Sequence, residues 1–150
     1  MNIEQTYTFK DVSRELLWQT LQDQGCLQRS LPGCKVFEEV EEKVYNTELG
    51  INIGPVKGVF TAVVRQVDII EPYSYRLLVQ GKGKPGEIDA DASMILEESE
   101  QGATLTCKAE VKVTGTLASV GQRVMGGVAK VVLGKFFKDI EKETKEMAKL

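Results

Sequence analysis

The stretch of sequence that decides the fold runs from Leu117 to Ala148, LASVGQRVMGGVAKVVLGKFFKDIEKETKEMA. Its apolar residues recur every three or four positions, and this spacing predicts one long amphipathic helix. The second half, from Lys138, is rich in Lys and Glu that can pair at four-residue spacing. A helix of this kind must lay its apolar face on another apolar surface. The predicted face comprises Leu117, Val120, Val124, Met125, Val128, Ala129, Val131, Val132, Leu133 and Phe136.

The sequence before this helix predicts the required surface, because apolar and polar residues alternate in successive segments. We expect strands at residues 2–9, 35–40, 45–53, 56–70, 73–81, 88–96 and 104–113. Two short helices should follow the first strand, one capped by Asp11 or Ser13 and one over residues 23–29. Residues 31–34 (LPGC) and 81–86 (GKGKPG) are expected to be loops.

The predicted strands are joined by short turns, so each strand should pair antiparallel with its neighbour. The C-terminal helix is the only long amphipathic element that can cover the apolar face of such a sheet. The sequence therefore predicts a single α+β domain over residues 1–150, in which a twisted antiparallel sheet curls around the long helix.

Composition argues against several classes of function. The net charge is -3 and the pI is about 5.2, which disfavours general nucleic-acid binding. The sequence has no histidine, so the commonest general base and metal ligand is absent. The first residues carry no secretion signal, and no apolar run reaches the length of a membrane span. We therefore expect a cytoplasmic protein with reduced cysteines, without a metal site and without catalytic residues.

Small residues interrupt the face of the sheet that should meet the helix. They are Ala62, Gly81, Ala90, Ala92 and Ala109, and Gly121 lies on the apolar face of the helix. The missing side chains leave either close contact between helix and sheet or space for a ligand. The residues alone leave both interpretations open.

Four motifs, in this order, resemble the family of the G subunit of carbon monoxide dehydrogenase. They are Leu31–Cys34 (LPGC), Ile53–Lys57 (IGPVK), Gly81–Gly83 (GKG) and Val113–Arg123 (VTGTLASVGQR). The resemblance covers almost the whole chain. That family belongs to the START-like (SRPBCC, helix-grip) superfamily, in which a curved antiparallel sheet wraps around a C-terminal helix and encloses an apolar cavity. The resemblance therefore implies a helix-grip fold, in agreement with the periodicity.

The resemblance also implies a function, that of a non-catalytic accessory protein of a carbon monoxide dehydrogenase-type molybdenum hydroxylase. Relatives are linked to membrane recruitment and to binding quinone-like lipids. Some members carry a hydrophobic tail after the helix, whereas this sequence stops at Leu150, so we expect either a soluble carrier or a peripheral contact at the inner face of the membrane. Two alternatives stay open: a structural recruitment factor without a ligand, and a small enzyme of the cyclase or hydratase type.

With this resemblance, we expect a ligand-binding cavity for a quinone or lipid under the helix, and no other cofactor. Tyr75 should place one hydroxyl in the otherwise apolar pocket, and the loops 31–34 and 81–86 should form its rim. The candidates for contact with an anionic membrane are Lys82, Lys84, Arg123 and Lys130. The expected lining consists of Phe60, Ala62, Tyr75, Leu77, Val79, Gly81, Ala92, Met94, Val111, Val113, Leu117, Val120, Gly121, Val124 and Met125.

Overall fold

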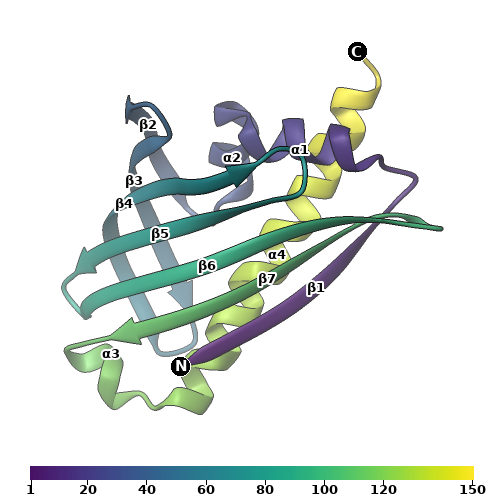
Figure 1. The fold of residues 1–150 in the computed structure, drawn as a ribbon. Coiled ribbons are helices and arrows are strands. Elements are labelled where there is room, and N and C mark those ends of the chain that lie inside the picture. The colour runs from purple at the N-terminus through teal and green to yellow at the C-terminus, as the bar shows by residue number, and fades with distance from the viewer.

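A curved seven-stranded antiparallel sheet wraps around one long helix in the computed structural model, which describes residues 1–150 (Figure 1). The strands lie in the order β1-β7-β6-β5-β4-β3-β2. The elements are β1 (Asn2–Lys10), α1 (Arg14–Gln22), α2 (Gln24–Ser30), β2 (Cys34–Glu41), β3 (Val44–Ile53), β4 (Val56–Ile70), β5 (Ser74–Gly83), β6 (Gly86–Ser99), β7 (Gly102–Val113), α3 (Thr116–Ser119) and α4 (Gln122–Ala148). This arrangement confirms the predicted α+β helix-grip fold.

The register of the sheet follows from the period-two alternation of the sequence. On β7, for example, Leu105 and Cys107 are buried on the concave face, while the residues between them point outward. One predicted loop was wrong: β5 continues to Gly83 and β6 begins at Gly86, so only Lys84 and Pro85 form the turn. Strand pairing overrides the local turn signal here, because Gly83 stays in register with Phe60 of β4.

The predicted C-terminal helix is interrupted near its start, which corrects the expectation of one continuous helix from Leu117. A short helix, α3, ends at Ser119, and α4 begins after Gly121. Gly121 has a φ angle of +95°, a conformation that favours glycine and cannot continue a right-handed helix. We call the α3–α4 junction, residues 116–122, the elbow.

The buried face of α4 is also shifted relative to the prediction. Val124 and Val131 are 43% and 54% exposed, although both were assigned to the apolar face. Each lies one position before a more buried residue. It is therefore rotated by about 100° around the helix axis from that buried residue. The buried face instead extends into the Lys- and Glu-rich half, where its fully covered members are Phe137, Ile140 and Thr144.

The packed core lies at the end of the molecule that α1 and α2 cover. There, the ring of Phe137 on α4 is fully buried and lies 5.7 Å from the ring of Tyr7, centroid to centroid. The Tyr7 hydroxyl donates a hydrogen bond of 2.9 Å to Glu141 Oε1. Burial, together with this bond to Glu141, raises the pKa of Tyr7 above its usual value. These contacts attach the second half of α4 to β1.

The caps of α1 and α2 follow the sequence signals. The Ser13 side chain accepts the backbone N–H of Leu16, and the Asp23 carboxylate accepts the backbone N–H of Cys26 at 2.9 Å. Because Ser13 makes this bond, it is the N-cap of α1, and Asp11 is not. The bond from Cys26 holds the pKa of Asp23 below its ordinary value.

We predict that the Asp23→Ala variant loses about 1 kcal/mol of unfolding free energy at pH 7, the usual cost of a lost N-cap. The folded-state pKa of Asp23 is lowered, so the stabilisation from its charge is present above the unfolded pKa and lost as pH falls through the folded pKa. The difference from wild type should therefore shrink below about pH 4. Urea titrations between neutral and acidic pH measure it.

The control for this experiment is Asp23→Asn, which keeps the accepting oxygen but has no charge to titrate. The free energy of unfolding of this variant should be close to that of wild type at neutral pH. It should also change less than that of wild type as the pH is lowered. A loss in Asp23→Ala that stayed constant across the acidic range would contradict the assignment.

Candidate ligand-binding cavity

A cavity of about 340 Å³ lies between α4 and the concave face of the sheet. Its volume is at the lower end of the about 300–1,000 Å³ typical of small-molecule sites. Apart from Gly81, every residue that lines it has an apolar side chain. Ten of the predicted residues are among them: Phe60, Ala62, Leu77, Val79, Gly81, Ala92, Met94, Val111, Val113 and Met125.

Small residues create the cavity. Ala62, Ala90, Ala92 and Ala109 line it together with Gly81, and a Cβ built on Gly81 would lie 3.5 Å from the Cβ of Ala62. The three atoms nearest to that Cβ all belong to neighbouring strands and none belongs to α4, so the cavity separates the helix from the sheet at this position. Of the two interpretations that the sequence left open, the structure shows the open space.

Several lining residues were missed by sequence reasoning. They are Met1, Ile3, Leu31, Leu49, Ile51, Val56, Ile88, Ala90, Cys107, Ala109, Val128, Ala129, Val132, Leu133 and Phe136. Most of them lie on the same strand face or helix face as predicted residues. The alternation along the strands and the three-or-four spacing along the helix therefore contained enough information to predict them. Leu31 belongs to the loop that was expected at the rim, whereas Met1 carries no such signal, because the register of β1 brings it to the cavity.

Tyr75 does not line the cavity, which corrects its expected role. Its side chain is 3% exposed and packs edge-on against Trp18, with ring centroids 5.3 Å apart. Burial raises its pKa well above the usual value. Tyr75 starts β5, where α1 covers the sheet, so its ring is part of the packed core.

The remaining predicted residues lie at the elbow. Leu117 and Gly121 line a second pocket of about 290 Å³, which we call the elbow pocket. Val120 packs against the small hydrophobic cluster beside it, whereas Val124 points to solvent and lines neither space. A side chain at Gly121 would meet open space but would be strained at its positive φ, so this position is a poor place to block the cavity.

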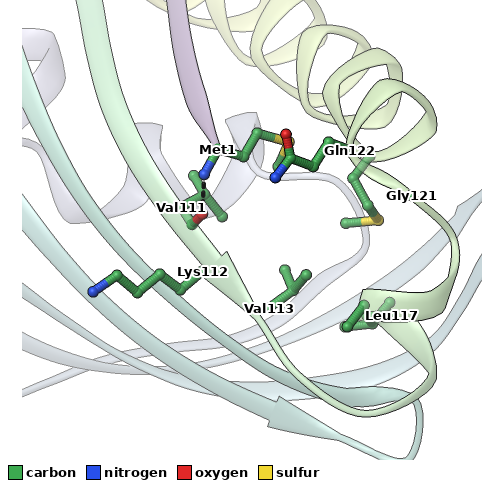
Figure 2. A pocket seen from close by; sticks show the side chains of 9 residues that line it. Met1, Val111, Lys112, Val113, Leu117, Gly121 and Gln122 are labelled. Carbon is green, nitrogen blue, oxygen red and sulfur yellow. Dashed lines mark hydrogen bonds between the residues drawn. The ribbon is translucent and has the colours of Figure 1, made fainter.

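The elbow pocket adjoins the cavity through four shared lining residues: Met1, Val111, Val113 and Met125. Unlike the cavity, it includes polar residues in its lining, namely Lys112 and Gln122. Figure 2 shows Met1 and Gln122 near the start of α4, and the Lys112 side chain leaving β7 toward the left of the view, away from them. The N-terminal ammonium of Met1 donates a hydrogen bond of 3.0 Å to the Val111 carbonyl oxygen.

A third pocket, of about 470 Å³, lies between α2, the loop 31–34 and α4. It shares only Leu31 with the cavity. Gly33 holds this loop against β3: its carbonyl accepts the N–H of Gly50 at 2.9 Å, and a Cβ on Gly33 would clash with the Gly50 carbonyl oxygen. The loop 31–34 is thus at the cavity wall, as predicted for a rim.

No charged side chain lines the cavity. Its one titratable side chain is the thiol of Cys107, whose pKa burial raises to about 11, so it is protonated at neutral pH. Met1, which also lines the cavity, has its N-terminal ammonium bonded to the Val111 carbonyl. The acidic residues of β6 face outward, where Asp91 forms a 2.6 Å ion pair with Arg76. No group of three or more His, Cys, Asp or Glu side chains is placed to hold a metal ion. None of the helices has both the length and the apolar character needed to cross a membrane.

A curved antiparallel sheet, a long C-terminal helix and an apolar cavity between them define a START-like protein. A model of the family described as the G subunit of carbon monoxide dehydrogenase (CoxG) matches residues 10–145. The chain belongs to this family.

Solved structures share the fold. A conserved protein from Geobacillus kaustophilus is 36% identical, with 97% of this chain and 96% of that chain covered and a TM-score of 0.93. A protein from Thermus thermophilus is 10% identical, with 98% and 99% covered and a TM-score of 0.73. A Chromobacterium violaceum protein is 14% identical, with 94% and 95% covered and a TM-score of 0.66. The last two show likeness of fold alone. A comparison with curated proteins found no significant match.

Proposed function

We propose that this chain is a non-catalytic accessory protein of a carbon monoxide dehydrogenase-type molybdenum hydroxylase, and that it binds a quinone or lipid in the cavity under α4. The observation that carries the proposal is a cavity of about 340 Å³ whose wall has no polar side chain. Apolar surface of this kind gains free energy when it excludes water and takes up an apolar molecule. Membership in the CoxG family supports the association with the enzyme.

The chemistry of the cavity supports binding rather than catalysis. General acid–base catalysis needs a titratable group within hydrogen-bond reach of the reacting atoms. Among the side chains of the cavity wall, only the Cys107 thiol titrates, and its raised pKa makes it a poor nucleophile at neutral pH. The cyclase or hydratase alternative, which would need a buried carboxylate in the cavity, is therefore the weaker proposal.

A basic surface near the elbow supports a role at the membrane. Lys82, Lys84 and Arg123 are exposed and form no ion pair within the chain. They lie close to the elbow, because the Leu117 N–H donates to the carbonyl of Pro85 in the β5–β6 turn. Each basic residue near an anionic surface contributes about 1 kcal/mol. We therefore place the action of the protein in the cytoplasm, peripherally at the inner face of the membrane.

One observation favours the alternative of a structural recruitment factor without a ligand. The two exposed valines of α4, Val124 and Val131, lie seven residues apart on the outer side of the helix. Residues with this spacing share one face, which could pack against the enzyme. Under this alternative, a tight complex with the enzyme would form while the cavity stayed empty.

The test is native mass spectrometry of the protein purified from its native host, followed by organic extraction of the bound material. We expect a mass shift that corresponds to one quinone or lipid per chain. A protein that is empty and also fails to take up added quinones would overturn the ligand-binding proposal and favour the structural alternative.

A further inference from the structure

We propose that the ligand is a single-chain amphiphile that lies along α4 with its polar head in the elbow pocket and its apolar tail directed toward Leu31. The head carries a hydrogen-bond acceptor, such as a quinone carbonyl or a carboxylate. This inference rests on the proposed ligand-binding function. It adds the direction of the ligand and names Gln122 as a residue that recognises the head.

The interior of the cavity excludes a polar head. Its wall has no hydroxyl, amide or charged side chain, and Tyr75, the only candidate from the sequence, lies outside it. A polar head placed inside would lose its hydrogen bonds to water without replacement, which is unfavourable. The head must therefore lie at one end of the cavity, and the tail inside.

The elbow end provides both access and a donor. Four residues line both the cavity and the elbow pocket, so the two spaces adjoin along a broad shared wall, whereas the pocket beyond Leu31 shares one residue with the cavity. Gln122 is exposed on the wall of the elbow pocket, and its side-chain amide makes no hydrogen bond within the chain. That amide is free to donate to an acceptor on the head.

The opposite end is less suited to a polar head. The pocket beyond Leu31 contains two cations that are already paired, Arg29 with Glu143 at 2.6 Å and Lys135 with Asp139 at 2.8 Å, so its unpaired amide donor is Gln28. The elbow pocket has the charged N-terminal ammonium of Met1 in addition to Gln122, and a charged donor binds an acceptor more strongly. Leu31 also stands between this pocket and the cavity, since it is the one residue that both share. An apolar tail can contact the Leu31 side chain, whereas a polar head would first have to displace it.

The single tryptophan reports the direction of the ligand. The lining residues of α4 extend from Met125 to Phe136, about 16 Å along the helix axis. Trp18 packs on Tyr75 at the start of β5, while the end of β5 leads to the turn that contacts the elbow. Trp18 is therefore at the far end of the cavity from the elbow pocket.

The experiment uses stearate that carries a nitroxide quencher either beside the carboxylate or near the methyl end, titrated into the wild-type protein. We expect both probes to bind, and the methyl-end nitroxide to quench Trp18 fluorescence more strongly. Gln122→Leu should weaken binding about 2- to 10-fold, the value of one hydrogen bond. The matched control, Gln28→Leu in the pocket beyond Leu31, should leave the affinity unchanged.

The outcomes separate this inference from the proposed function. Stronger quenching by the carboxylate-end nitroxide, or weakening by Gln28→Leu instead of Gln122→Leu, would overturn the direction while leaving ligand binding intact. If neither probe binds and added quinones also fail, the proposed function fails as well. Competition against the bound probe then compares the two heads: displacement at a lower concentration by a decyl-substituted quinone than by unlabelled stearate would identify the preferred acceptor as a quinone carbonyl, and the reverse would identify a carboxylate.

Discussion

Replacement of Phe137 by alanine should lower the free energy of unfolding by about 3–5 kcal/mol, the usual range for a fully buried phenylalanine. Phe137 is 0% exposed, and its ring contacts Tyr7 in the core between α4 and β1. Removing the ring leaves a void in the region that attaches the second half of α4 to the sheet. Chemical denaturation monitored by circular dichroism measures this loss.

The matched control is the preceding residue of the helix. Phe136 is half-buried and lines the cavity, so its ring already faces open space on one side. Phe136→Ala should therefore cost clearly less than Phe137→Ala, because fewer packing contacts are lost. Equal losses in the two variants would show that the region around Phe136 is as tightly packed as the core, and would contradict the open cavity.

Filling the cavity from α4 should abolish most ligand binding. Ala129 lines the cavity on the face of α4 that also presents Met125 and Val132. In Ala129→Leu and Ala129→Phe, the added carbons project into space that the ligand would occupy. We expect affinity for a quinone or fatty-acid probe to fall at least about tenfold for the leucine variant, equivalent to about 1.4 kcal/mol, and further for the phenylalanine variant.

The same variants should remain folded, which separates loss of binding from loss of structure. Leucine is nearly as good a helix former as alanine, and it fills an existing space without displacing neighbours. Ala148→Leu and Ala148→Phe place the same side chains at an exposed position on α4 and should bind as wild type does. Unchanged affinity in a folded Ala129→Phe protein would exclude the cavity as the ligand site.

Much of the fold could be predicted because its determinants are local. Period-two alternation identified the strands, and the segment 56–70 matches β4 (Val56–Ile70) at both ends. The second short helix, expected over residues 23–29, is α2 (Gln24–Ser30). The errors arose where tertiary pairing competes with local signals. The glycines of GKGKPG predicted a loop, yet most of this stretch pairs as the ends of β5 and β6.

The helix face was harder to predict because the sequence does not reveal what the helix packs against. Spacing alone predicts that an apolar residue such as Val131 is buried, yet Val131 lies outside the contact between the helix and the sheet. Thr144, in the Lys- and Glu-rich half, is fully buried and donates its hydroxyl hydrogen to the Ile140 carbonyl. The packing of α1 and α2 over this half of α4 determines that burial.

The amino-acid sequence by itself determined the order of the elements, the apolar face of the sheet and the family, because alternation and motifs are properties of neighbouring residues. The tertiary structure alone decided whether the small residues of the sheet leave a space, since that depends on the distance between helix and sheet. It also placed Tyr75 in the core. It brought Met1, next to β1, and Met125 of α4 together in the wall of the cavity. Contacts between residues so far apart in the chain depend on the curvature of the sheet, which no local pattern specifies.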